Sequence, residues 1–167
     1  MTNFEIRLET AEDAAELSRL SAEAFGPGRF ARTAYRLREG VLPVAGLCLT
    51  GWLDERLIGG IRFTAIRVGE AQGALLGPLV VDPAVKGRGY GKALVGEGLS
   101  RTKDAGFGLV LLVGDVPYYG RFGFVPVAPG RITLPGPVDP ARLLIVELAP
   151  GALEGAAGEV RAHAPLA

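Results

Sequence analysis

The fold is decided by the stretch Gly77-Pro78-Leu79-Val80-Val81-Asp82-Pro83-Ala84-Val85-Lys86-Gly87-Arg88-Gly89-Tyr90-Gly91-Lys92-Ala93-Leu94-Val95-Gly96-Glu97-Gly98-Leu99. An apolar run is followed by a glycine-dense loop and a segment compatible with a helix, which predicts a strand, a loop and a helix N-terminus. Glycines carry no side chain, so a ligand can approach this backbone closely. The free N–H groups of a first helical turn favour an anion, and Arg88 and Lys92 add positive charge. The stretch therefore predicts a loop that binds phosphate groups.

Two common phosphate-binding motifs do not match this loop. A dinucleotide fingerprint needs a third glycine three residues after the second, where this chain has Lys92. A P-loop needs a glycine five residues before its Gly-Lys pair and Ser or Thr after the lysine. The chain has Lys86 and Ala93 at those positions. The loop therefore disfavours a nucleotide-binding protein of either class.

The loop does resemble the acyl-CoA loop of the GNAT acetyltransferase superfamily, whose pattern is Gln or Arg, two residues, Gly, one residue, then Gly or Ala. The run Lys86-Gly87-Arg88-Gly89-Tyr90-Gly91 fits this pattern except at its first position, where lysine replaces Gln or Arg. Lysine keeps a hydrogen-bond donor but lacks the planar guanidinium fork. By itself, the loop is also compatible with an ordinary glycine-rich turn.

A second motif strengthens the resemblance: Gly114-Asp115-Val116-Pro117-Tyr118-Tyr119-Gly120-Arg121-Phe122-Gly123-Phe124. GNAT enzymes often carry a tyrosine four residues before a Gly-Phe pair, as Tyr119 stands here. The Tyr-Tyr-Gly-Arg-Phe-Gly-Phe run, and residues 150–153, look like the YhbS-like branch. The resemblance covers nearly the whole chain, most specifically residues 75–127. Many members have Asn seven residues before the tyrosine; this chain has Leu112 there, and Asp115 is a candidate for part of that role.

Composition limits the class of protein. The 167 residues suit one domain, 1–167, with 49% hydrophobic and 22% charged residues. Lys plus Arg equals Asp plus Glu at 18 each, which argues against nucleic acid as the main partner. No uncharged apolar run approaches the roughly 18 residues that a membrane span needs. One cysteine excludes an internal disulfide framework. We therefore expect a cytoplasmic monomer or homodimer.

The apolar pattern predicts the order of elements. Helices are expected after a cap at Thr10, at 31–39, from the glycine loop to about Ala105, and as one turn at 118–122. Turns are expected at 54–55 and 69–73, and residues 149–167 are expected to form a C-terminal tail with a small strand at 159–161. Strands are expected at 4–8, 44–52, 57–68, 74–81, 109–113, 124–127 and 143–148.

This order resembles the GNAT fold, an α/β (α+β) architecture with a central mixed, mostly antiparallel sheet flanked by helices; periodicity alone gives only a mixed α/β sheet. The resemblance implies direct transfer of acetyl from acetyl-CoA to a primary amine of a small molecule or peptide in a ternary complex. It also implies that acetyl-CoA is held by the strand and loop residues Leu79, Val80, Val81, Lys86, Gly87, Arg88, Gly89, Tyr90, Gly91 and Lys92.

The reaction assigns further roles. A backbone N–H near Val80 or Val81 is expected to stabilise the thioester oxygen as the amine attacks. The leaving thiolate needs a proton, and a phenol titrating at about 10 can supply it to a thiol titrating at about 8.5. Tyr119 is the candidate general acid, with Tyr118 in reserve. The general base stays unassigned among Asp115, Asp82, Glu70 and a bound water.

Several residues have ordinary structural interpretations. Cys48 lies mid-strand and is expected to be buried, and His163 is expected on the surface. No cluster has metal-ligand spacing, so no metal is expected. Arginines at 29, 32, 131 and 142 suggest the hypothesis of an anionic acceptor. The alternative function is a non-catalytic acyl-CoA-binding or sensing module.

Overall fold

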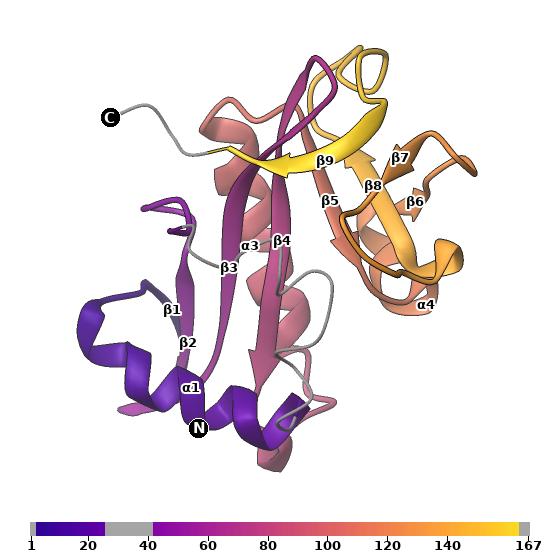
Figure 1. Cartoon of the computed structure of the whole chain (residues 1–167). Helices are drawn as coiled ribbons and strands as arrows, with labels where there is room; N and C mark the ends of the chain where they lie inside the picture. The colour runs from indigo at the N-terminus through magenta and orange to yellow at the C-terminus, as the bar shows by residue number, and fades with distance from the viewer. Residues whose placement is uncertain (1–2, 26–41, 164–167) are drawn as a thin grey trace.

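The structure is a computed structural model that describes residues 3–25 and 42–163. In the described chain, nine strands form a sheet with the order β1-β2-β3-β4-β5-β8-β6, and β9 pairs with both β3 and β7 (Figure 1). Neighbouring strands are antiparallel except for the pairs β4–β5 and β7–β9, which confirms a mixed, mostly antiparallel sheet. The strands are β1 (Phe4–Leu8), β2 (Leu49–Leu53), β3 (Arg56–Val68), β4 (Ala71–Val81), β5 (Leu109–Val113), β6 (Val125–Pro126), β7 (Ile132–Thr133), β8 (Leu143–Glu147) and β9 (Gly158–Ala162).

The two long helices of the described chain cover opposite faces of this sheet. They are α1 (Ala14–Phe25) and α3 (Tyr90–Asp104) (Figure 1). A Cβ on Gly59 of β3 would meet Leu94 of α3 at 3.4 Å, whereas a Cβ on the next residue, Gly60, would meet Leu17 of α1 at 2.7 Å. Successive Cβ atoms of a strand point to opposite faces, so the helices lie on either side of β3. No helix in the described residues is both long enough and apolar enough to span a membrane.

The N-terminal elements follow the sequence pattern. The carboxylate of Asp13 accepts hydrogen bonds from the backbone N–H of Thr10 at 2.8 Å and from its hydroxyl at 3.2 Å, at the start of the 3-10 turn η1 (Ala11–Asp13) that leads into α1. Leu17 and Leu20 are buried, and Ala24 is half-buried on the same helix. The expected helix end at 26–28, the expected helix at 31–39 and the arginines at 29 and 32 lie outside the described residues.

Helix α3 packs closely against the central sheet. Leu94, Val95 and Leu99 of this helix share a buried cluster with Phe63 of β3. Gly98 faces the same ring, and a Cβ there would lie 2.6 Å from the Phe63 side chain. The helix can approach the sheet this closely because position 98 has no side chain.

The starts of β2 and β4 differ from those expected. β2 begins at Leu49 rather than residue 44, because Gly46 has φ +85° and Leu47 N–H donates to Val44 O in a turn at 3.0 Å. β4 begins at Ala71 rather than residue 74, and the turn expected over 69–73 shrinks to two residues. Gly73 is a strand residue whose missing side chain makes room for Leu109, since a Cβ there would lie 2.4 Å from it.

The chain's end adds to the sheet. The small strand expected at 159–161 is confirmed as β9, one residue longer at each end. It pairs antiparallel with β3 at Ile66, Arg67 and Val68, and its Val160 is buried. Part of the segment expected to be a tail is therefore integrated into the sheet. The strand expected at 124–127 is reduced to the two residues of β6.

The sheet opens between β4 and β5. These parallel strands pair at Ala74 with Val110 and at Leu75 with Leu111. The register of β3 against β4 shifts between Ile61 and Phe63, as in a β-bulge. Within the described residues, β4 pairs with β5 only at Ala74 and Leu75, and beyond the shift it continues to Val81 paired with β3 alone. The candidate site lies along this part of β4.

Candidate active site

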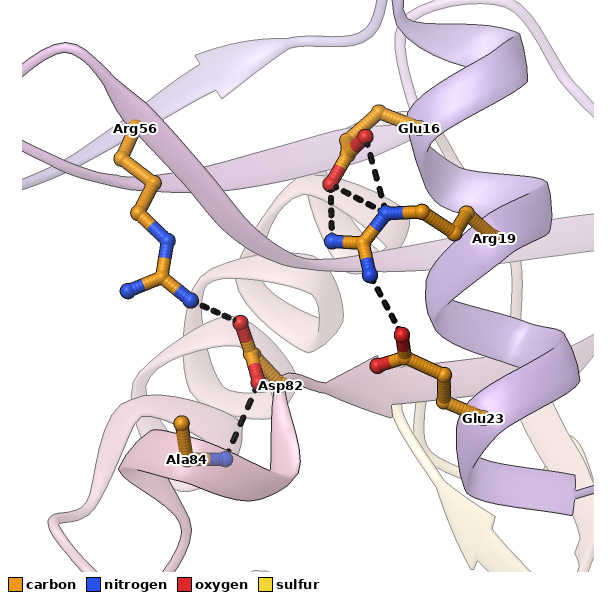
Figure 2. Close-up of polar contacts among 6 residues, drawn as sticks. All are labelled: Glu16, Arg19, Glu23, Arg56, Asp82 and Ala84. Carbon is orange, nitrogen blue, oxygen red and sulfur yellow. Dashed lines mark hydrogen bonds and ion pairs between the residues drawn. The ribbon is translucent and has the colours of Figure 1, made fainter.

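Asp82 fixes the point where β4 leaves the sheet. Its backbone N–H donates to Ile58 O of β3 at 2.7 Å. Its buried carboxylate accepts the Ala84 N–H at 2.9 Å with one oxygen and forms an ion pair with the Arg56 guanidinium with the other (Figure 2). The bond to Ala84 caps the 3-10 turn η3 (Pro83–Val85). Asp82 therefore anchors the loop, and its engaged carboxylate makes it a poor candidate for the general base.

The other side chains in Figure 2 belong to α1. Arg19 bonds to Glu16 and to Glu23 on the exposed side of the helix. Glu16 lies about one turn before Arg19 and Glu23 about one turn after it, so the two carboxylates share a single positive charge. Glu23 directly precedes Ala24, which lines the cavity described below.

The loop after η3 has the shape of an anion cradle. Gly87 and Gly89 have φ values of +79° and +89°, and a Cβ on either residue would meet nothing within 4 Å. Gly89 is the N-cap of α3, so the N–H groups of the following turn have no partner within the helix. Positive φ strongly favours glycine, and the open space leaves these N–H groups accessible to a ligand.

A cavity of about 360 Å³ joins this loop to the end of β4. It includes every residue expected to bind acetyl-CoA except Arg88, which is exposed and lies outside its lining. Ala24 and Val85 also line it and were not expected. Val85 is an apolar residue within a polar loop, which was a usable signal, whereas nothing in the sequence distinguished Ala24. The full lining is Ala24, Leu79, Val80, Val81, Val85, Lys86, Gly87, Gly89, Tyr90, Gly91, Lys92 and Tyr118.

The backbone of Val81 faces the open side of β4. Val81 lies opposite Gly59, and the bond from Asp82 N–H to Ile58 O identifies this as a non-hydrogen-bonded pair. The N–H of Val81 therefore points away from β3. It is directed toward the gap that β5 leaves, where it can donate to a ligand.

The adjacent tyrosines of α4 (Val116–Tyr119) occupy different surroundings. Tyr118 lines the cavity, and its hydroxyl would lie 2.5 Å from a Cβ on Gly91 in the first turn of α3. Both tyrosines are half-buried and pack against the same core cluster. The Tyr119 ring would lie 2.5 Å from a Cβ on Gly114 and stands 5.9 Å from the Phe124 ring between centroids. Tyr118 thus lines the cavity and Tyr119 does not, although their rings are in edge-on contact at 4.8 Å between centroids.

Burial raises the pKa of both phenols. For Tyr118 the increase is opposed by Arg121, whose positive charge lowers the pKa. For Tyr119 the desolvation is stronger, and Tyr118 and Asp115 raise its pKa further. The Arg121 guanidinium lies 5.7 Å from the centroid of the Tyr118 ring, and its Nε donates to the Tyr118 carbonyl at 3.0 Å.

Comparison with known proteins agrees with this geometry. Residues 14–124 match the acetyltransferase (GNAT) family. The chain belongs to this family. It is 33% identical to the uncharacterized N-acetyltransferase YhbS of Escherichia coli K12 over 161 residues, which cover 95% of each chain.

Two solved structures extend the likeness to ligand-bound relatives. The crystal structure of E. coli YhbS in complex with CoA superimposes with a TM-score of 0.83 at 30% identity, covering 98% of this chain and 91% of that one. A GNAT family acetyltransferase from Brucella melitensis in complex with acetyl-CoA has a TM-score of 0.64 at 29% identity, covering 86% and 96%. The sequence resemblance and the expected fold are therefore confirmed.

Other expected functional residues have structural partners. Arg142 pairs with Asp115 at 3.0 Å. Arg131 donates to the backbone carbonyls of Ala156, at 2.9 Å, and Leu153. These contacts weaken the hypothesis that both arginines bind an anionic acceptor.

The remaining candidates give no sign of a reactive or metal centre. Cys48 is buried, its Sγ lies 3.5 Å from Val44 O, and burial raises its thiol pKa, which disfavours the nucleophilic thiolate. His163 lies just after β9 and is half-buried, with its backbone N–H bonded to Ala65 O at 2.9 Å. Within residues 3–25 and 42–163, no three His, Cys, Asp or Glu side chains group as metal ligands.

Proposed function

We propose that this protein is an N-acetyltransferase that moves the acetyl group of acetyl-CoA directly to the primary amine of a small-molecule or peptide acceptor. One observation carries the proposal: the glycine loop, the first turn of α3 and the end of β4 line a single cavity. A pyrophosphate needs exposed N–H donors and positive charge, and a thioester needs a donor at its carbonyl oxygen. The cavity offers both kinds of donor along one wall.

The loop would hold the pyrophosphate of acetyl-CoA. Gly87 and Gly89 leave open space where other residues would project a Cβ, and Lys86 and Lys92 supply charge at the cavity wall. Arg88 is exposed within the loop and would contact outer phosphate groups. The pantetheine arm would lie along Leu79, Val80 and Val81, on the side of β4 that faces away from β3.

Residues that line the same cavity would also assist the transfer of the acetyl group. A neutral amine attacks the thioester carbonyl carbon, and negative charge develops on its oxygen. The Val81 N–H is aimed into the gap and would stabilise that charge. The carbon–sulfur bond then breaks, and the thiolate takes a proton from a nearby phenol. The two candidate phenols are Tyr119, which the motif favours, and Tyr118, which lines the cavity.

Calorimetric titration of the full chain tests the binding part of the proposal. We expect acetyl-CoA and CoA to bind and NADH and ATP, used as controls, to bind far more weakly. Absence of acetyl-CoA binding by folded protein would refute the proposal. Release of CoA thiol with a panel of amines then tests transfer; the panel contains a polyamine, lysine, short peptides with free N-termini and an aminoglycoside. Binding without transfer to any of them would favour the acyl-CoA-binding module.

A further inference from the structure

We propose that the Tyr118 hydroxyl donates a hydrogen bond to the pyrophosphate of acetyl-CoA, so that α4 contributes to the phosphate cradle of the glycine loop and α3. The inference rests on the proposed acetyltransferase function and adds a cofactor-binding residue to it. The sequence offers Tyr118 only as the reserve general acid, and it predicts acyl-CoA contacts from residues 79–92 alone. The position of the hydroxyl indicates a different role.

The Tyr118 hydroxyl lies against the first turn of α3. A Cβ built on Gly91 would stand 2.5 Å from this hydroxyl and 3.8 Å from the ring carbon that carries it. Gly91 is the second residue of α3, in the turn whose N–H groups have no partner within the helix. Tyr118 and Gly91 both line the cavity. The phenol therefore meets α3 at the turn where an anion would bind.

This place belongs to the pyrophosphate of the cofactor and not to its sulfur. The first turn of α3 is the part of the cavity that offers N–H donors to a phosphate group. The pantetheine arm separates the pyrophosphate from the thioester, so a hydroxyl beside this turn does not serve the leaving thiolate. The proposed role therefore removes Tyr118 from the two phenols considered for proton transfer.

The hydroxyl is free to donate to a ligand. No residue in the described ranges 3–25 and 42–163 forms a hydrogen bond with it, and Tyr118 lines the cavity. Burial raises the pKa of this phenol although the charge of Arg121 opposes the increase, so the group keeps its proton at neutral pH. A protonated phenol donates to an anionic oxygen, and such charge-assisted hydrogen bonds are the stronger ones.

Glycine at position 91 is explained by this contact. Gly91 lies within α3, where alanine is the better helix former, and the acyl-CoA loop pattern also accepts alanine there. A methyl group at 91 would lie 2.5 Å from the Tyr118 hydroxyl, so the phenol would have to move away from the turn. The absence of a side chain at 91 therefore allows the hydroxyl to reach the cradle.

Arg121 adds positive charge on the same side. Its Nε donates to the Tyr118 carbonyl at 3.0 Å, and its guanidinium lies 5.7 Å from the Tyr118 ring centroid. The acidic residue of this segment, Asp115, is paired with Arg142 at 3.0 Å. Because Arg121 is exposed, its attraction for a phosphate is screened. Arg121→Gln should raise the acetyl-CoA Kd by about threefold at low salt and by less at high salt.

Matched variants of the full chain test the assignment by calorimetric titration. Tyr118→Phe removes only the hydroxyl and should raise the acetyl-CoA Kd by about 10-fold, as loss of a hydrogen bond to a charged group does. Its kcat at saturating acetyl-CoA should stay within about threefold, whereas loss of a general acid lowers kcat by about 100-fold or more. Tyr119→Phe removes the same atom one residue away and should leave the Kd within about twofold. Thermal unfolding without ligand checks that each variant is folded.

Analogues of the cofactor identify the group that the hydroxyl contacts. Acetyl-CoA lacking its 3′-phosphate keeps the pyrophosphate, and Tyr118→Phe should weaken its binding by the same factor. S-acetylpantetheine keeps the arm and lacks the pyrophosphate, so its competition with acetyl-CoA should not change in the variant. A loss confined to intact acetyl-CoA would indicate the 3′-phosphate, and an equal loss with acetylpantetheine would indicate the arm. Either result would overturn the assignment.

A double-mutant cycle tests the contact between α4 and α3. Gly91→Ala should raise the acetyl-CoA Kd by about fivefold, because the new methyl group displaces the hydroxyl. In the Tyr118→Phe background, the ring leaves room for the methyl group, so the same substitution should change the Kd by less than about twofold. Equal effects in both backgrounds would mean that the two residues act independently, and would contradict a shared site.

The outcomes distinguish this inference from the proposed function. Unchanged acetyl-CoA affinity in Tyr118→Phe, or a 100-fold loss of kcat with native affinity, would overturn the role of Tyr118 and leave the acetyltransferase function standing. Absence of acetyl-CoA binding by the unmodified chain would overturn both.

Discussion

The glycines just before α3 and the glycines within it lie in different surroundings. Before the helix, Gly87 and Gly89 have positive φ and open space around them, so the absence of a side chain benefits a ligand. In the helix body, Gly98 has Phe63 against it, so the absence of a side chain benefits packing. Gly96, two residues earlier, has nothing within 4 Å. Within about a dozen residues, glycine therefore occurs in an open loop, at a tight packing contact and at a position without any close neighbour.

Among the substitutions of these glycines, the largest effect is expected in the loop before α3, where acetyl-CoA is proposed to bind. Gly89→Val places a β-branched side chain at φ +89° and fills the open cradle. We expect the affinity for acetyl-CoA to fall by about 100-fold or more, which corresponds to about 2.7 kcal/mol. Calorimetric titration measures the change directly.

Gly106 provides the matched control at the other end of α3. It has φ +94° and equally open surroundings, but it does not line the cavity. Gly106→Val should reduce the free energy of unfolding through a similar backbone strain and leave the acetyl-CoA Kd nearly unchanged. An equal loss of affinity in both variants would mean that strain, and not filling of the cradle, weakens binding.

Asp82 tests whether the open loop depends on an anchor outside the glycines. Asp82→Ala removes the acceptor of the Ala84 N–H and the partner of Arg56. We expect the free energy of unfolding to fall by about 2 kcal/mol, mostly from the lost cap because Arg56 is exposed, as well as a higher acetyl-CoA Kd. Asp82→Asn keeps an oxygen for Ala84 and should recover part of both losses. Thermal unfolding and titration measure the two effects, and a stable Asp82→Ala variant with native affinity would contradict the anchoring role.

The sequence was enough to predict the strand, the glycine loop and the start of α3 that follow one another at residues 71–90, because glycine spacing and the apolar run before it are local features. It also predicted most of the strands and the two ends of α3. It could not assign roles within the Tyr118-Tyr119 pair. Adjacent residues of a helix project about 100° apart, so the two side chains have different surroundings, and two identical residues give no indication of which one reaches the cavity. The family motif chose Tyr119, whereas the cavity contains Tyr118.

Other differences come from tertiary contacts that local patterns do not show. The apolar run at 44–48 has strand composition, but the positive φ of Gly46 turns the backbone before β2 begins. Gly73 looked like part of a turn, and it is a strand glycine that admits Leu109. Ala24 joins the cavity only because α1 crosses the end of β4. Each of these positions depends on a neighbour distant in sequence.

Within α3, the tight contact of Gly98 with Phe63 predicts a smaller effect for Gly98→Ala. The new methyl group would lie 2.6 Å from the fully buried Phe63 ring, so the ring or the helix must move. Overpacking of this kind lowers the free energy of unfolding by about 1–3 kcal/mol, whereas the better helix propensity of alanine raises it by about 1 kcal/mol. We expect a net loss of about 1 kcal/mol in the free energy of unfolding, measured by denaturant titration. A stabilised Gly98→Ala variant would show that the contact with Phe63 relaxes without cost.

Gly96→Ala should change stability least, and in the opposite direction. Position 96 is exposed in the middle of α3, and a Cβ there would meet nothing within 4 Å. Alanine restricts the unfolded chain and adds no clash, so the free energy of unfolding should rise by about 0.5–1 kcal/mol. The same denaturant titration measures it, with acetyl-CoA affinity as a second readout that should not move. Because the two substitutions are chemically identical and two residues apart, opposite signs at 96 and 98 would isolate the Phe63 contact from helix propensity. A loss of stability or affinity in Gly96→Ala would instead mean that this glycine has a ligand or partner that the packing of α3 does not reveal.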